Sequence, residues 1–399
     1  MMEKKLYIIS VLGRDRPGLI ASVTGVLANA RANIIDIDQV VLRGLLAMFM
    51  IVDYSTSKVK SEEVNSMLKD KAKELGITID VEPYIEYMLT TEPEKKVKDL
   101  VLVTILGKDK PGIVHSFSDL FYHLGTNIER IRMIARGEII VTEYLVDTGD
   151  MGWSDLRGSL QKRASKVGMN IVFQPRDVFK RAKKLVVFDM DSTLVDAEII
   201  DEIAKSSGVE ERIRDVTRAA MNGEIEFEDA LRERVKLLKG LDVKVLEDIA
   251  ENTKLTPGAE ELLATLKELG YKVALISGGF TFFTDRLKEK FNLNYAYAND
   301  LDIKDGKLTG KLKGRIIDAE AKRDIMKEIA AKEGLEMDEV IAIGDGANDR
   351  YLVEDAGLGI AFNPKKVLKK YADGVLTDNN IKGLLYCLGD YREKVLKKE

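Results

Sequence analysis

Two aspartates, Asp189 and Asp191, follow the short apolar stretch 185–188 in the sequence D-M-D-S-T. Such a stretch is typical of a buried β-strand. Active sites of open α/β sheets lie beyond the carboxyl ends of the strands. Two acids spaced by one residue leave the strand end on the same side, so one could be a nucleophile and the other could carry a proton.

A second apolar stretch, 272–276, leads into Ser277 and Gly278. A hydroxyl beside free N–H groups in a flexible loop suits phosphate oxygens. Lys322 comes early in a later helical segment, and its charge could offset that of a phosphate. These groups extend the prediction from a pair of acids to a phosphate site.

A third apolar stretch, 340–344, is followed by Asp345, Asn348 and Asp349. Several carboxylates at one sheet edge would repel one another unless a hard cation lay among them. Each motif alone could be an ordinary helix cap or turn. Their occurrence in order at three strand ends favours a site that handles phosphate and a cation.

The elements that must position these residues alternate between strands and helices from residue 184 onward. Short, wholly apolar strands separated by helices predict a doubly wound parallel sheet covered on both faces. Residues 197–252 carry helical periodicity and no strand, which predicts a helical cap inserted between the first two strands. Asp305-Gly306 predicts a tight hairpin further along.

The first half of the chain contains an internal repeat, because residues 6–37 align with 100–131 without a gap. Each copy predicts the order β-α-β-β-α-β, a ferredoxin-like arrangement. The repeated turn has the form Asp-x-Pro-Gly before a helix, with an asparagine beyond the helix. Its matched residues are Asp15, Gly18 and Asn33 in the first copy and Asp109, Gly112 and Asn127 in the second.

Two polar stretches divide the chain into three predicted domains of α/β class. These are residues 1–90, residues 98–176, and residues 184–399 with the cap at about 197–252. The chain has 399 residues, 45% of them hydrophobic, and a net charge of -5. This composition excludes a disordered chain and disfavours non-specific nucleic-acid binding. One cysteine and no apolar run of about 18 residues favour a cytoplasmic protein without a membrane span.

The motifs resemble the haloacid dehalogenase superfamily of phosphohydrolases, and within it the members that act on O-phosphoserine. The resemblance covers roughly residues 185–385. It rests on F-D-M-D-S-T-L, S-G-G-F and G-D-G-A-N-D, together with Lys322 and the cap residues Glu198, Met221 and Phe227. The paired N-terminal repeats are similar to ACT domains, small modules that bind amino acids.

The superfamily resemblance implies that Asp189 attacks phosphorus to form an aspartyl phosphate, while Asp191 acts as acid and base. It implies that Mg²⁺ binds Asp189, the carbonyl of Asp191, and Asp345, with Asp349 orienting a bound water or the lysine. It further implies phosphate-binding groups at Ser277, Gly278, Lys322 and Asn348.

The same resemblance assigns the amino-acid part of the substrate to the cap. Glu198 would bind the ammonium and Arg234 the carboxylate, with Met221 and Phe227 over the substrate. The alternative is that Arg234 is a solvated helix residue and that Met221 and Phe227 are cap core.

The ACT resemblance implies an amino-acid effector, with serine as the candidate, and a homodimer. Helix-start N–H groups at Gly18 and Gly112 would receive a carboxylate, and Asn33 and Asn127 would reach it from a paired module. The alternative is that glycine and proline only shape the turn and that asparagine only ends the helix.

Three functions stay open at this point. The first is Mg²⁺-dependent hydrolysis of O-phospho-L-serine, the last step of serine biosynthesis, under amino-acid control. The second is transfer of the phosphoryl group to another hydroxyl amino acid such as homoserine. The third is an amino-acid sensor with a non-catalytic scaffold.

Overall fold

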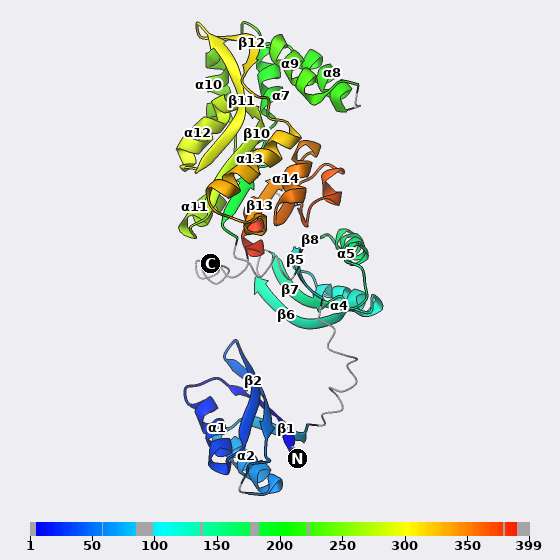
Figure 1. Ribbon diagram of the computed structural model, residues 1–399, viewed down its shortest axis with the longest axis vertical. Coiled ribbons are helices and arrows are strands. Elements are labelled where there is room, and N and C mark those ends of the chain that lie inside the picture. The colour runs from blue at the N-terminus through cyan, green and yellow to red at the C-terminus, as the bar shows by residue number, and fades with distance from the viewer. Residues whose placement is uncertain are drawn as a thin grey trace. The chain divides into compact units, whose positions relative to one another are not determined.

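The computed structural model describes residues 5–57, 59–84, 99–135, 139–175, 183–221, 224–377 and 380–388. The chain divides into two compact units, Met1–Val97 and Lys98–Glu399 (Figure 1). Each unit has its own buried apolar core. Among the described residues, no helix combines the length and the apolar character that crossing a membrane requires.

The first unit is the first repeat. Its elements are β1 (Leu6–Arg14), α1 (Leu19–Ala30), β2 (Asn33–Leu42), β3 (Leu45–Asp53), α2 (Ser61–Leu75) and β4 (Thr78–Pro83). The strands form an antiparallel sheet in the order β2-β3-β1-β4. Apolar side chains of α1 and α2 pack on one face of this sheet and form the core of the unit.

The second repeat has the same order of elements. They are β5 (Leu100–Gly107), α4 (Ile113–His123), β6 (Asn127–Ala135), β7 (Ile140–Asp147), α5 (Trp153–Val167) and β8 (Met169–Pro175). The predicted β-α-β-β-α-β arrangement is therefore confirmed in both copies. Gly18 and Gly112 precede α1 and α4 with φ angles of 86° and 90°, a conformation that glycine adopts without strain.

The remaining region alternates strands and helices as predicted. Its strands are β9 (Leu185–Phe188), β10 (Lys272–Phe280), β11 (Tyr295–Lys304), β12 (Lys307–Lys313), β13 (Val340–Gly344), β14 (Leu358–Phe362) and β15 (Gly374–Leu376). Its α-helices outside the cap are α11 (Ala259–Glu268), α12 (Thr281–Phe291), α13 (Ala319–Lys332) and α14 (Arg350–Asp355). The neighbouring strands β11, β10, β9, β13, β14 and β15 are parallel, with β9 near the centre.

Strand β9 is buried on both faces. Val186 and Phe188 belong to the apolar core formed with α11 and α12, whereas Leu185 and Val187 belong to the core formed with α13 and α14. A strand covered in this way has no solvated face, which explains its unbroken apolar sequence. Its carboxyl end is thus fixed by packing on both sides.

The predicted cap is confirmed. It consists of α7 (Ile199–Ser207), α8 (Glu210–Met221), α9 (Phe227–Leu237) and α10 (Val243–Asn252). Helix α9 lies beside the β11–β12 hairpin (Figure 1), and the Gly240 N–H donates to the Leu308 carbonyl there. The hairpin turns at Asp305 and Gly306, whose φ angles of 52° and 73° match the predicted tight turn.

One sheet runs through the second repeat and the parallel region, a continuity that the sequence does not indicate. Strand β15 pairs antiparallel with β8, which carries the order on through β5, β7 and β6. The Asn170 side chain in β8 accepts hydrogen bonds from the N–H and hydroxyl of Thr377. The second repeat therefore shares its sheet with the region that holds the predicted site.

Candidate active site

Three adjoining strands bring the predicted acids together. Strand β9 lies between β10 and β13, and the three strands run parallel. Each strand carries one predicted residue at, or just beyond, the carboxyl end of its paired segment: Asp189 for β9, Ser277 for β10 and Asp345 for β13. The Asp189 N–H donates to the Ile343 carbonyl over 2.9 Å, which extends the β9–β13 ladder into the site. The strand-end prediction is therefore correct in its geometry.

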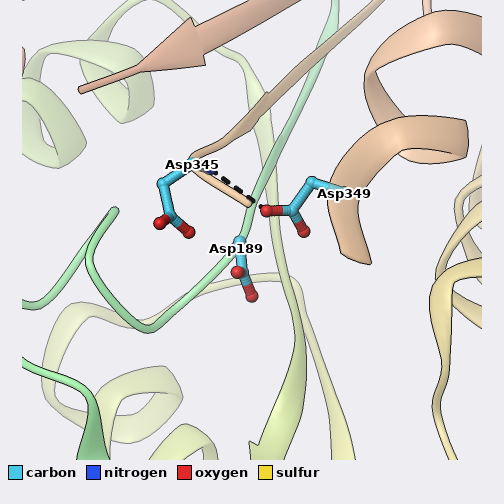
Figure 2. A group of neighbouring side chains, drawn as sticks. All are labelled: Asp189, Asp345 and Asp349. Carbon is cyan, nitrogen blue, oxygen red and sulfur yellow. Dashed lines mark hydrogen bonds between the residues drawn. The ribbon is translucent and has the colours of Figure 1, made fainter. Parts of the chain in front are cut away.

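Asp189, Asp345 and Asp349 form a compact cluster (Figure 2). Each offers a carboxylate oxygen, and these oxygens lie within 4.8 Å of one another. All three side chains are buried. Three buried anions this close favour a cation among them, and carboxylate oxygens suit a hard divalent ion.

Asp349 is already engaged by neighbouring groups. Its Oδ2 accepts from the N–H groups of Asp345 and Gly346, both over 3.1 Å. Its Oδ1 accepts from Lys322 over 2.7 Å. A side chain at position 344 would place its Cβ 2.4 Å from the Asp349 Cγ, so Gly344 is needed for this approach. Asp349 therefore acts as a fixed support for the cluster.

Lys322 lies fully buried between two carboxylates. Its Nζ donates to Asp189 Oδ1 over 2.8 Å as well as to Asp349. Burial alone would lower the pKa of Lys322, but the attraction of Asp189 and Asp349 outweighs it and raises this pKa. Burial and the charge of Asp349 raise the pKa of Asp189, against the effect of Lys322. Lys322 thus balances charge next to the predicted nucleophile.

A cavity of about 340 Å³ opens between the sheet edge and the cap. This volume lies at the lower end of the range for small-molecule sites. The sheet contributes the acids described above, and the cap contributes residues of α7, α8 and α9. The lining residues are Asp189, Asp191, Glu198, Ile200, Thr217, Ala220, Phe227, Leu231, Arg234, Gly278, Gly279, Phe280, Asp345, Ala347, Asn348 and Lys365.

Asp191 faces this cavity and is held at one oxygen. Its Oδ1 accepts from the Ile199 N–H over 3.0 Å. A Cβ on Gly279 would lie 3.0 Å from the other oxygen, so this glycine leaves room for the carboxylate. Burial raises the pKa of Asp191 to about 7, although the Ile199 N–H opposes the shift. A carboxyl group with this pKa can both donate and accept a proton near neutral pH.

Lys365 is a cavity residue that the sequence reasoning missed. Its Nζ lies 3.2 Å from Glu198 Oε1 and 3.3 Å from Asp345 Oδ2. Burial raises the pKa of Asp345 to about 6, while the two carboxylates raise the pKa of Lys365 to about 12 against its burial. Lys365 follows β14, the next strand beyond β13, so a search of all strand ends could have found it.

The cap places Glu198 and Arg234 in the cavity, as predicted. The Glu198 carboxylate accepts from the Ser192 hydroxyl over 3.1 Å. Burial lowers the pKa of Arg234, against the attraction of Asp201 and Glu198. Arg234 is therefore not the solvated helix residue of the alternative interpretation.

The three other predicted residues, Phe227, Met221 and Ser277, differ in their position relative to the cavity. Phe227 lines it, and its ring lies 3.6 Å from where a Cβ on Gly278 would be. The Met221 side chain lies outside the described residues. Ser277 is fully buried behind the wall, and its Oγ accepts from the Gly279 N–H over 2.8 Å.

The Gly278 loop has a support that sequence reasoning also missed. The side chain of Asn299 in β11 donates to the Gly278 carbonyl over 2.8 Å and accepts from the Ile317 N–H. Asn299 is buried, at 1% exposure. Nothing in the local sequence marks this asparagine, because its partners belong to distant parts of the chain.

In the second repeat, some of the predicted effector residues line a hollow and one does not. Asp109 and Gly112 line a hollow of about 560 Å³ together with Met133 and Ile140. Asn127 instead donates to Glu129 over 2.7 Å.

The first repeat separates its predicted effector residues. Asn33 lines a different hollow, beside α1. The Asp15 N–H donates to the Gly44 carbonyl, which joins two turns of the sheet. Of these two hollows, the one beside Asp109 and Gly112 is not lined by Asn127, and the one beside Asn33 is not lined by the turn of the first repeat.

Comparisons with known proteins agree with this fold and site. A family model of haloacid dehalogenase-like hydrolases matches residues 183–357, and one of the ACT domain matches residues 5–82 and 99–174. The fold, the carboxylate site and these matches define a haloacid dehalogenase-like hydrolase with two ACT domains. The chain is 49% identical to a phosphoserine phosphatase of Archaeoglobus fulgidus, over 88% of this chain and 100% of that protein. It belongs to the phosphoserine phosphatase family.

Further relatives extend the match. A phosphoserine phosphatase of Streptomyces coelicolor is 35% identical over 97% of this chain and 93% of its own length. A solved structure of a substrate-bound phosphoserine phosphatase complex shares 44% identity and a TM-score of 0.50, over 52% of this chain and 99% of that one. A haloacid dehalogenase family hydrolase of Salmonella enterica serovar Typhi reaches a TM-score of 0.66 at 27% identity, over 73% and 99%.

Proposed function

We propose that this protein hydrolyses O-phospho-L-serine to L-serine and phosphate. The observation that carries the proposal is the shared cavity. Its sheet side offers Asp189 and Asp191, and its cap side offers Glu198 and Arg234, which carry opposite charges. A phosphate with a zwitterionic amino-acid head would find complementary groups on both sides.

Asp189 is the proposed nucleophile. Its carboxylate oxygen attacks phosphorus, the bond from phosphorus to the serine oxygen breaks, and an aspartyl phosphate forms. Asp191 gives its proton to the departing serine oxygen. Water then attacks the aspartyl phosphate, Asp191 takes a proton from it, and phosphate leaves. The pKa of about 7 on Asp191 suits both transfers, since general acid–base help is greatest near the working pH.

The cluster of aspartates fits a hard divalent cation, and Mg²⁺ is the proposed ion. The Asp189 and Asp345 carboxylates and the Asp191 carbonyl would hold it. When bound, the ion would neutralise charge on the phosphate oxygens. Asp349 would stay outside the ligand set, because Lys322 and two backbone N–H groups already occupy its oxygens.

Phosphate oxygens would meet three further groups. The Gly278 N–H and the Asn348 side chain lie at the cavity wall, and Lys322 lies just behind Asp189. As charge spreads over the oxygens during transfer, such fixed donors stabilise the transition state. Ser277 would contribute from behind the wall, by fixing the Gly279 N–H.

The proposed head-group contacts follow from charge. Glu198 would bind the ammonium and Arg234 would grip the carboxylate, for which its planar fork is suited. Phe227 would cover the apolar part of the substrate. To bind a carboxylate, Arg234 must have guanidinium N–H groups to donate. Its Nε–H already donates to the Ala230 carbonyl of its own helix. The contact with the substrate carboxylate would therefore come from the terminal N–H groups.

The test is phosphate release from O-phospho-L-serine with Mg²⁺, by the native chain and by Asp189→Asn. The amide cannot attack phosphorus, so the variant should lose turnover while its circular dichroism stays native. Preserved phosphate release in the purified variant would contradict the mechanism. Adding homoserine and looking for phosphohomoserine would detect transfer in place of hydrolysis.

For the ACT domains we propose an amino-acid effector, with serine as the first candidate. The hollow beside Asp109 and Gly112 supports it, since helix-start N–H groups attract a carboxylate. Calorimetry of serine against the native chain and Asp109→Ala would test this site. Equal binding by both would remove Asp109 from it.

A further inference from the structure

The loop that carries Asp191 folds back on itself in a strained turn. Three successive N–H groups, those of residues 193–195, donate to the Met190 carbonyl over 2.9–3.3 Å. Ser192 has a φ angle of 53°, a left-handed conformation that residues other than glycine seldom adopt. Such strain persists where the surrounding structure holds the residue, commonly at active sites. We call residues 190–197 the catalytic loop.

The linker that returns from the cap to the core pairs with this loop. It comprises residues 253–258, between α10 and α11. The Asp196 N–H donates to the Lys254 carbonyl over 3.0 Å, and Val195 forms an antiparallel bridge with Leu255. The two chain segments that connect the cap to the core are therefore hydrogen-bonded to each other.

Thr256, in this linker, makes two further bonds to the catalytic loop. Its N–H donates to the Leu194 carbonyl over 3.0 Å. Its hydroxyl donates to the Thr193 carbonyl over 2.6 Å, which joins two residues 63 positions apart. Thr256 is 5% exposed and Thr193 is fully buried. Because the site is buried, loss of the hydroxyl would leave the Thr193 carbonyl without an equivalent donor.

Thr256 is itself fixed to the core of the hydrolase domain. Its carbonyl accepts from the Ala259 N–H at the start of α11. Apolar side chains of α11 belong to the same core as those of β9 and β10. The carbonyl of the next residue, Pro257, accepts from the Ile381 N–H in the 3₁₀ helix η4 (Ile381–Cys387). A group supported in this way can keep a neighbouring site in its productive geometry.

We propose that Thr256 is a positioning residue for Asp191. The inference rests on the proposed function, in which Asp191 gives its proton to the leaving oxygen as the bond from phosphorus to that oxygen breaks. Asp191 lies two residues before Thr193, the residue whose carbonyl Thr256 holds. Without the hydroxyl the strained loop would relax and Asp191 would move from the leaving oxygen. A displacement of about 1 Å can lower a rate about 100-fold.

The experiment compares two aryl phosphates that have no amino-acid head group. Phenyl phosphate needs a proton on its leaving oxygen more than p-nitrophenyl phosphate does, because p-nitrophenolate is the weaker base. Thr256→Val matches the shape of threonine and removes the hydroxyl. Its kcat/KM should fall at least about tenfold for phenyl phosphate but less than about threefold for p-nitrophenyl phosphate, because the displaced group is the general acid.

Three variants provide the controls. Thr256→Ser keeps the hydroxyl and should retain most of the native kcat/KM on both esters. Thr253→Val removes a hydroxyl from the same linker, where it donates to the Ile249 carbonyl within the cap, and should change neither value. Asp191→Asn sets the scale, because it should show the same dependence on the leaving group in a stronger form.

A residue that only supports the fold would not distinguish the two leaving groups. Equal losses on both esters in Thr256→Val, or no loss, would therefore overturn the proposal, as would a Thr256→Ser variant as impaired as the valine one. If Thr256→Val does not fold by circular dichroism, Thr256→Ala is measured instead, since it leaves room for a water at the Thr193 carbonyl. Failure of both to fold would show a structural role and overturn the proposal.

The Asp191→Asn result separates this proposal from the proposed function. If that variant shows no dependence on the leaving group, Asp191 is not the general acid, and the positioning role of Thr256 is refuted with it. If Asp191→Asn shows the dependence and Thr256→Val does not, only the role of Thr256 is refuted. Both readings hold whether or not the native chain hydrolyses phosphoserine, because neither ester carries the amino-acid head group.

Discussion

The Lys365 ammonium lies 3.2 Å from the Glu198 carboxylate at the cavity wall. Glu198 comes from the cap side and Lys365 from the loop after β14, so the pair links the two walls of the cavity. Lys365 also reaches Asp345. One cation thus compensates a proposed metal ligand and a proposed ammonium-binding group.

Replacing Lys365 with methionine should impair phosphoserine turnover. Two carboxylates would lose their shared cation, and a phosphate dianion would approach a more negative wall. We expect kcat/KM to fall roughly tenfold, mostly through KM, which corresponds to about 1.4 kcal/mol. Lys365→Arg should retain most of the native value. Steady-state kinetics of the two variants decide the matter, and an undiminished kcat/KM for Lys365→Met would exclude the role.

Lys322→Met should destabilise the fold as well as stop turnover. The change leaves Asp189 and Asp349 buried without their cation, and removing one partner of a buried ion pair costs about 3–5 kcal/mol. Urea unfolding without added metal measures this loss. Lys327→Met is the control, because Lys327 pairs with Asp355 at the surface and such pairs contribute about 1 kcal/mol or less. Equal losses in both variants would count against the buried pairing.

Arg234→Ala should separate substrates by their head group. Its kcat/KM for phosphoserine should fall roughly 100-fold, the scale of about 3 kcal/mol for a lost charged contact. Turnover of p-nitrophenyl phosphate should change little, because that ester has no carboxylate. Arg232→Ala, an exposed neighbour paired with Glu228, should alter neither. Parallel losses on both esters would place Arg234 outside the head-group site.

Asp373 should make stability depend on pH. Burial raises its pKa from 3.8 to about 6, although the Gly359 N–H and the charges of Arg157 and Lys183 oppose the shift. The folded state therefore binds the proton more tightly than the unfolded state. Protonated Asp373 therefore contributes about 3 kcal/mol to the free energy of unfolding. This contribution is fully present below about pH 4 and is lost as pH rises through 6.

Comparison with Asp373→Asn isolates this effect. The amide does not titrate and keeps an acceptor oxygen for the Gly359 N–H. The unfolding free energy of the native chain, relative to the variant, should decline between pH 4 and pH 7. Urea titrations at several pH values measure it, and a constant difference across that range would show that Asp373 does not titrate as described.

Removing residues 1–97 should leave phosphoserine turnover without added serine unchanged. The cavity and every residue proposed to act in it lie in the second unit. The first unit has a separate core of its own. Kinetics of a chain beginning at Lys98 test this, and a large drop in kcat would mean that the first ACT domain supports the site.

The strand ends were the predictable part of the site. Asp189, Ser277 and Asp345 follow local apolar stretches, and parallel strands bring their carboxyl ends to one edge. Lys365 was not predicted as a site residue, because the end of its strand carries no acid or glycine motif. Asn299 was not predicted either, because it acts through a hydrogen bond to Gly278. Hydrogen-bond partners that are distant in sequence leave no local pattern.

The fold was predictable for a similar reason. Hydrophobic periodicity and the internal repeat reflect local burial, so they yielded both ACT domains and the cap. The pairing of β8 with β15 brings together residues about two hundred positions apart, such as Asn170 and Thr377. The pairing of the two strands is made by backbone N–H and carbonyl groups, which every residue carries. No residue type in the sequence therefore indicates which strands will pair.

The junction between β8 and β15 also bears on solubility. An open sheet edge presents unpaired backbone groups to any other chain and is a site of aggregation. The second ACT domain closes the edge at β15, and the apolar Leu106 and Val172 cover the neighbouring core. In this chain the β15 side of the hydrolase sheet is therefore paired and not open. A gene shortened to the hydrolase domain alone would need a new way to shield that strand.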